Sequence, residues 1–167
     1  MKNTISYKSF NEPLDLEPIK FSLAMREEGP GWSLDKIAML EKWYRRFLFL
    51  VKLYPEKMIV PTKDIDLFWH THILDTKKYM MDCESLFGGY FHHFPYFGMR
   101  GERDKMNMKK AFSETEELYL EVFGESPLGC GIADCGSLCN EPTPESKDST
   151  FQIGIRPTLA EIASVSS

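Results

Sequence analysis

The chain has 167 residues, which is the usual length of one domain with tails. A hydrophobic fraction of 43%, with 12 Phe and 7 Tyr, excludes a disordered chain and suffices for a core without disulfides. The net charge of −5 excludes the general positive field that attracts nucleic acid. The sequence starts without a signal-like apolar segment, and its longest apolar run, residues 47–51, is far too short to span a membrane. We therefore expect a cytoplasmic protein that contacts neither nucleic acid nor membrane.

Residues 1–32 are predicted to form an irregular N-terminal arm, because Pro13, Pro18 and the Gly29-Pro30-Gly31 cluster interrupt it. One or two helical turns fit between Pro18 and Met25. Apolar side chains spread along the arm are expected to anchor it to the rest of the domain: Phe10, Leu14, Leu16, Ile19, Phe21 and Leu23.

The first long helix is predicted over residues 34–53. Ser33 is a favourable N-cap and Asp35 suits the first turn, while Pro55 disfavours helix at the residue before it. Apolar residues recur at helical spacing through this segment: Ile37, Leu40, Trp43, Tyr44, Phe47, Leu48 and Val51.

A second, continuous helix is predicted from Thr62, as N-cap, to Phe87. Gly88-Gly89 is a typical C-terminal stop. Its apolar set comprises Ile65, Phe68, Trp69, Ile73, Met80 and Leu86. The loop that follows, residues 88–101, is so rich in aromatic residues that we expect it to fold back onto the helices.

A third helix is predicted over residues 102–123, ending at Gly124. Residues 126–167 lack a periodic apolar pattern, so we expect a flexible, disordered C-terminal tail. The predicted fold class is therefore all-α: a compact bundle of about three main helices in a core domain, residues 33–125, with the returning aromatic loop.

All four histidines lie between residues 70 and 93. Imidazole is a common metal ligand and a common general base near neutral pH. Asp66 and His70 are i, i+4 partners on one helix face, and the returning loop can bring His93 to them. Two imidazoles and one carboxylate suit zinc or non-haem iron with open coordination positions.

A second arrangement competes with the first. His72 lies about 200° around the helix from His70, so the two histidines cannot share a metal on a regular helix. His72 could instead meet a loop histidine, with Tyr79 nearby. On a continuous helix His72 and Cys83 are roughly 16 Å apart, which excludes a site made of these two. For either arrangement the alternative interpretation is that the histidines have structural roles, with Asp66 only orienting an imidazole.

A second cysteine group, Cys130, Cys135 and Cys139, lies in the predicted tail. The spacing is that of a loose metal or redox tract, but it forms no Cys-x-x-Cys pair and has no fourth local ligand. The simpler interpretation is a set of incidental thiols, reduced in the cytosol.

One stretch of residues resembles the glycine-rich domain-containing protein-like family, known from plants, fungi and bacteria. The resemblance covers about residues 30–125, and its most specific part is an Asp-x-x-Trp-His-x-His core with a later Tyr and His. The matching residues are 44–48, Tyr54-Pro55, 60–62, 66–72, Tyr79, Cys83, Phe87-Gly88 and His93. The resemblance implies functional roles for Asp66, His70, His72 and His93. It implies no agreed chemistry, and the plant members of the family carry further domains that we do not expect in this chain.

The leading hypothesis is a metal-binding domain, with zinc or iron bound by Asp66, His70 and His93. If the metal is catalytic in a hydrolytic or oxidative reaction, His72 is the expected acid/base or supporting group and Tyr79 a hydrogen-bond donor. The rival hypothesis is a non-catalytic interaction module. In that case the histidines are structural, and the aromatic loop and Cys-containing tail contact a partner protein.

Overall fold

The computed structural model describes residues 5–27 and 29–127. These residues form six α-helices and no strand, which confirms the all-α class. The helices are α1 (Tyr7–Asn11), α2 (Glu17–Ala24), α3 (Leu34–Leu53), α4 (Lys63–Leu74), α5 (Thr76–Phe87) and α6 (Glu102–Phe123). Within the described ranges, no helix combines the length and the apolar character that crossing a bilayer requires.

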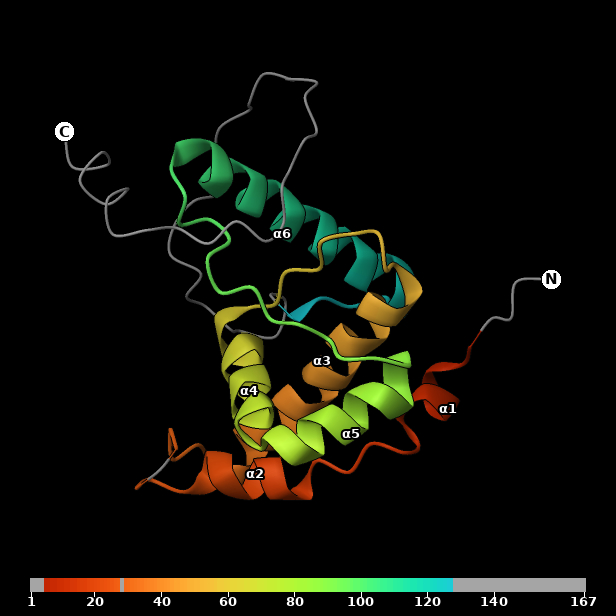
Figure 1. Cartoon of the computed structure of the whole chain (residues 1–167), viewed down its shortest axis with the longest axis vertical. Helices are drawn as coiled ribbons and strands as arrows, with labels where there is room; N and C mark the ends of the chain where they lie inside the picture. Colours follow the sequence, from red (N-terminus) through yellow and green to blue (C-terminus); the bar gives the residue numbers. More distant parts are fainter. Residues whose placement is uncertain (1–4, 28, 128–167) are drawn as a thin grey trace.

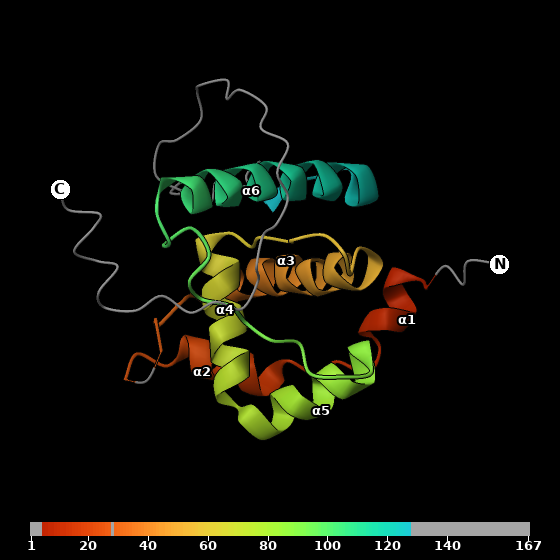
Figure 2. The same cartoon turned by 45° about the horizontal axis from the view of Figure 1, so that its top comes forward.

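Helix α3 is the centre of the fold and contacts α1, α2, α4 and α6. Figure 2 shows α6 lying along one side of α3, with α2 and α5 on the opposite side and α4 running between these two levels. Because α3 is surrounded, eight of its side chains are buried: Ile37, Leu40, Trp43, Tyr44, Phe47, Leu48, Phe49 and Leu50. The largest of them, Trp43, Tyr44 and Phe47, have no measurable exposure.

The first and third predicted helices have the bounds expected from the sequence. At the start of α3, the Ser33 hydroxyl accepts a hydrogen bond from the Lys36 backbone N–H at 3.3 Å. Helix α6 ends at Gly124, whose φ of +70° lies in the left-handed region that favours glycine. Local signals determined these ends, which is why the sequence alone located them.

Helix α2 confirms the helical turns expected between Pro18 and Met25, and the N-terminal arm is more regular than predicted only in that it also contains α1. Five of the six expected anchors are buried: Phe10, Leu14, Leu16, Ile19 and Leu23. The expectation for Phe21 is wrong, because this side chain is 68% exposed. Phe21 lies about 200° around the helix from Ile19 and therefore faces away from the core.

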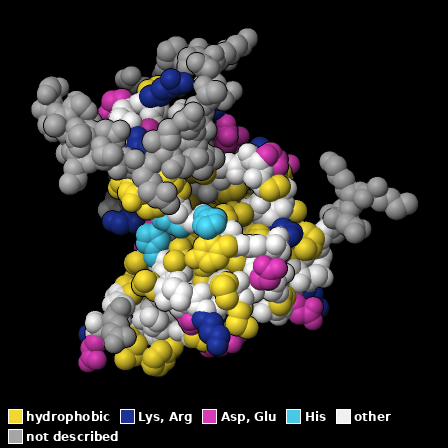
Figure 3. Space-filling model, viewed as in Figure 1, with side chains coloured by type: hydrophobic (Ala, Val, Ile, Leu, Met, Phe, Trp, Pro, Cys, Tyr) yellow, Lys and Arg dark blue, Asp and Glu magenta, His cyan; other side chains and the backbone are white. Residues whose placement is uncertain are grey.

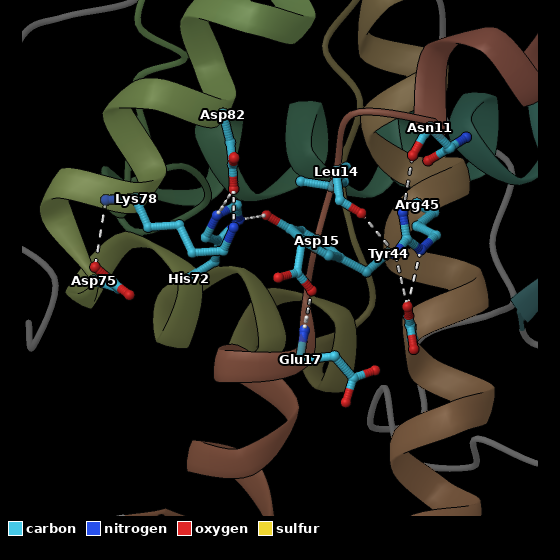
Figure 4. Close-up of polar contacts among 11 residues, drawn as sticks. Asn11, Leu14, Asp15, Glu17, Tyr44, Arg45, His72, Asp75, Lys78 and Asp82 are labelled. Carbon is cyan, nitrogen blue, oxygen red and sulfur yellow. Dashed lines mark hydrogen bonds and ion pairs between the residues drawn. The ribbon is translucent and has the colours of Figure 1, made fainter.

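Arg45 on α3 fixes the arm through its backbone. Its Nη2 donates to the carbonyl of Leu14 at 3.0 Å and to the carboxylate of Glu41 at 2.8 Å (Figure 4). Burial alone would raise the pKa of Glu41, but the ion pairs with Arg45 and Lys20 outweigh it and lower that pKa. The arm is thereby part of the same folded unit as the helical core.

The prediction of one continuous helix from residue 62 to 87 is wrong. The chain bends at Asp75 (φ −81°, ψ 72°), which ends α4 and begins α5 (Figure 1). The Asp75 carboxylate accepts a hydrogen bond from the Lys78 backbone N–H at 3.3 Å, so Asp75 acts as the N-cap of α5. The bundle consequently has four long helices and two short ones, not about three main helices. Residues 128–167 of the predicted tail, with Cys130, Cys135 and Cys139, lie outside the described residues.

Candidate metal centre

Three predicted ligands converge on one point of the surface. Asp66 and His70 lie one turn apart on α4, and His93 comes from the loop after α5. The two Nε2 atoms of His70 and His93 are 3.0 Å apart. Asp66 Oδ1 is 3.2 Å from Nε2 of His93, and Asp66 Oδ2 is 3.4 Å from Nε2 of His70. The predicted grouping of these residues is confirmed.

The cluster is open on one side. The side chains of His70 and Asp66 are 44% and 35% exposed, whereas that of His93 is 17% exposed. Figure 3 shows histidine side chains gathered together on the surface and bordered by apolar side chains. An ion at the point of convergence would therefore have protein on one side and solvent on the other.

An aromatic layer lies beneath His93. The Trp69 ring contacts the edge of His93 at a centroid distance of 4.6 Å and stacks almost parallel on Phe91 at 4.8 Å. Trp69 Nε1 donates a hydrogen bond to the Tyr79 hydroxyl at 2.9 Å, and that hydroxyl donates to the Phe91 carbonyl at 2.6 Å. The loop therefore folds back onto the helices, as its aromatic content predicted.

His72 belongs to a separate, buried group of polar side chains (Figure 4). Its Nδ1 is 2.9 Å from the Tyr44 hydroxyl and its Nε2 is 2.8 Å from Asp82 Oδ2, which also pairs with Lys78. Burial lowers the pKa of His72, although the hydrogen bond to Asp82 opposes this shift. Burial likewise raises the pKa of Tyr44. A neutral His72 that donates from Nε2 to Asp82 and accepts from Tyr44 at Nδ1 satisfies all three groups.

The alternative arrangement, in which His72 meets a loop histidine, is not the one the structure shows. Both ring nitrogens of His72 are taken by Tyr44 and Asp82, and its side chain is 1% exposed. Tyr79 does lie beside it, with the two rings edge to face at 5.0 Å. His92, the other loop histidine, packs on the ring of Tyr90 at 4.8 Å.

Comparison with known proteins shows the family of this chain. The sequence model of the family described as UCP032817-like matches residues 16–117, well over half of the chain. The chain belongs to this family. The match begins at Leu16, just before α2, and ends inside α6, so it includes α4, α5 and the loop that carries His93.

Two plant relatives of this UCP032817-like chain carry the name that the sequence resemblance suggested. It is 36% identical over 85 residues to "Glycine-rich domain-containing protein 1" of Arabidopsis thaliana, covering 48% of this chain and 10% of that protein. It is 34% identical over 105 residues to "Glycine-rich domain-containing protein 2" of the same plant, covering 60% and 13%. The chain thus spans about a tenth of the length of these relatives. No solved structure matches it.

Sequence reasoning missed two polar residues of the UCP032817-like domain, Tyr44 and Asp82. The helical spacing places Tyr44 on the apolar face of α3 and gives no sign of its polar contact with His72. Asp82 escaped notice because ten residues of continuous helix would place it about 15 Å from His72. The signal that could have found it is the Asp75-Thr76 pair, a typical helix start inside the predicted helix. The predicted separation of His72 from Cys83 assumed one continuous helix, and the bend shows that this assumption does not hold.

Proposed function

We propose that this domain binds one divalent transition-metal ion, zinc or iron, through Asp66, His70 and His93. The observation that carries the proposal is the set of three short distances among the ligand atoms. All of these atoms lie within 4.8 Å of one another, and they come from two separate parts of the fold. Two imidazoles and one carboxylate form a donor set that zinc and non-haem iron accept, and that leaves coordination positions open.

The distances fit a metal ion. Ligand atoms at 2.0–2.1 Å from a tetrahedral zinc ion are about 3.3 Å from each other. The two Nε2 atoms are 3.0 Å apart here, and the two oxygens of Asp66 each lie near one of them, Oδ1 at 3.2 Å from His93 and Oδ2 at 3.4 Å from His70. An ion at their centre would therefore need only small movements of the three side chains.

Hydrogen bonds among the three side chains cannot satisfy all of them at once. The two hydrogen-bond contacts, His70 to His93 and His93 to Asp66, both use Nε2 of His93, which can carry at most one proton. If both Nε2 atoms are protonated, the contact of 3.0 Å between His70 and His93 brings two N–H groups together. If only one is protonated, the lone pair of the other Nε2 faces the Asp66 carboxylate. A cation bound by all three groups removes this conflict.

The open side of the cluster supports a catalytic form of the proposal. Three protein ligands leave room for water or a substrate on the metal, and His70 and Asp66 are the more exposed ligands. A hydrolytic or oxidative reaction is consistent with such a site. In this proposal His72 and Tyr79 support the ligands from the interior of the domain. Each is only 1% exposed, so neither can touch a substrate.

The test is the metal content of protein purified without chelator and of protein reconstituted with zinc or iron(II). We expect about one ion per chain in the wild type, and its loss in His70→Ala and His93→Ala. His92→Ala is the matched control, because His92 is the neighbouring loop histidine outside the cluster. Wild-type protein that takes up no metal after reconstitution would refute the proposal. That result would favour the rival interaction module, whose partner protein would then have to be sought.

A further inference from the structure

One of the three proposed ligands lies on a segment without regular structure. Asp66 and His70 share a rigid helix, but His93 follows α5 on a stretch, residues 88–95, that contains neither helix nor strand. A loose loop would have to be ordered each time an ion binds, and that ordering weakens binding. The affinity of the cluster therefore depends on what fixes the loop near His93.

Two contacts fix Phe91, which lies two residues before His93. Its carbonyl accepts the 2.6 Å hydrogen bond from the Tyr79 hydroxyl, and its ring stacks on Trp69 with an interplanar angle of 8°. These contacts come from α4 and α5, on both sides of the bend at Asp75.

The Tyr79 hydroxyl is where these contacts meet. It accepts from Trp69 Nε1 on α4 and donates to the Phe91 carbonyl of the loop, while its own ring is part of α5. Burial raises the pKa of Tyr79, so the hydroxyl keeps its proton and remains a donor at any physiological pH. Trp69 in turn contacts the His93 ring directly, at 4.6 Å.

We propose that Tyr79 is a positioning residue for the metal centre: its hydroxyl fixes the Phe91 backbone and thereby places His93 opposite Asp66 and His70 before an ion binds. This inference rests on the proposed function. It changes the role expected for Tyr79, since the hydroxyl donates to the loop backbone and not to a substrate. It also explains why a ligand on an irregular loop lies within 3.2 Å of both of its partners.

The first experiment compares Tyr79→Phe with Tyr119→Phe in the full chain. Tyr119 is equally buried, and its hydroxyl also donates to a backbone carbonyl, that of Trp43, at 3.4 Å between α6 and α3. Zinc affinity is measured by competition with a chromophoric chelator, and the ligand field by the visible spectrum of the cobalt(II) form. We expect Tyr79→Phe to weaken zinc binding about tenfold or more and to change the cobalt spectrum. Tyr119→Phe should leave both unchanged.

Wild-type affinity in Tyr79→Phe, or an equal loss in Tyr119→Phe, would overturn the inference while leaving the proposed metal site intact. Absence of metal from the wild type would overturn both. The two failures are therefore distinguishable by the wild-type measurement alone.

A measurement on the wild type decides the question if Tyr79→Phe fails to fold. If the hydroxyl couples the loop to the ligands, bound zinc must also stabilise the hydrogen bond from Trp69 to Tyr79, because coupling is reciprocal. Hydrogen exchange at the Trp69 indole N–H should then slow when zinc is added. The indole N–H of Trp43, which is buried and has no hydrogen-bond partner among the described residues, is the internal control. Equal exchange at Trp69 with and without saturating zinc would contradict the inference.

Discussion

His72 and Asp82 lie ten residues apart in the sequence, yet His72 Nε2 and Asp82 Oδ2 are 2.8 Å apart. Trp69 and Tyr79 have the same sequence separation and are joined by a hydrogen bond of 2.9 Å. Both contacts cross the bend at Asp75, and a straight helix would separate each pair by about 15 Å. The bend thus creates the buried polar group around His72 and also the support beneath His93.

The contact between His72 and Asp82 should be important for stability. In Asp82→Ala the buried Nε2–H of His72 loses its acceptor, and a buried unsatisfied donor costs about 1–3 kcal/mol. Asp64→Ala is the matched control, since Asp64 on α4 forms a more exposed ion pair with Lys36 at 2.9 Å. Removing that pair should cost less than about 1 kcal/mol. Urea unfolding measures both, and equal losses would contradict a special role for the buried pair.

The bend itself is the second target. Asp75→Ala removes the side chain that accepts from the Lys78 N–H, and loss of such a cap costs about 1 kcal/mol. Asp75→Asn should cost much less, because asparagine is a comparable N-cap. Thermal or urea unfolding of the two variants tests this. An Asn variant as unstable as the Ala variant would show that the carboxylate charge, and not the cap, determines the bend.

These contacts also define what the sequence could predict. Local signals such as Ser33, Gly88 and Gly124 determine helix ends, and they were sufficient for α3, α6 and the end of α5. The i, i+4 spacing of Asp66 and His70 predicted that these two residues share a helix face. The aromatic content of the loop predicted that the loop returns and brings His93 to them. The partners of His72 were not predictable in this way. They depend on a bend that one N-cap residue introduces into an otherwise periodic segment, and on Tyr44 from another helix.

The loop before α6 should show an acid-dependent stability. Asp104 is 8% exposed and accepts hydrogen bonds from the backbone N–H groups of Gly98 and Arg100 and from the Arg100 guanidinium. Burial would raise the pKa of Asp104, but the bonds with Arg100 and Gly98 outweigh it and lower that pKa below the usual 3.8. The unfolded chain then binds the proton more readily, so stability must fall as the pH drops.

The corresponding variant is Asp104→Asn. At pH 7 it should be less stable than the wild type by about 1–3 kcal/mol, because charge-assisted hydrogen bonds become neutral ones. The difference should persist down to about pH 5 and shrink as the pH falls through the lowered pKa of Asp104. Glu102→Gln, at an exposed carboxylate in the same turn, should change stability by less than about 0.5 kcal/mol. If the stability difference between the wild type and Asp104→Asn did not change with pH, the role assigned to the Asp104 charge would be contradicted.

Metal binding by the folded state should be visible as added stability, and Asp66 provides the sharpest test. An ion that binds only the folded chain stabilises it by about 2.7 kcal/mol at a free concentration of one hundred times Kd. Zinc should therefore raise the Tm of the wild type. Asp66→Asn keeps the shape and one carbonyl oxygen but removes the negative charge, so the same zinc concentration should raise its Tm much less.

Asp64→Asn is the control, because Asp64 lies two residues earlier on α4 and about 200° around the helix from Asp66. Its Tm should respond to zinc as the wild type does. Each protein is also measured with excess chelator, so that the change in intrinsic stability is subtracted. An undiminished response in Asp66→Asn would remove Asp66 from the ligand set and leave the two histidines as the only protein ligands among the described residues.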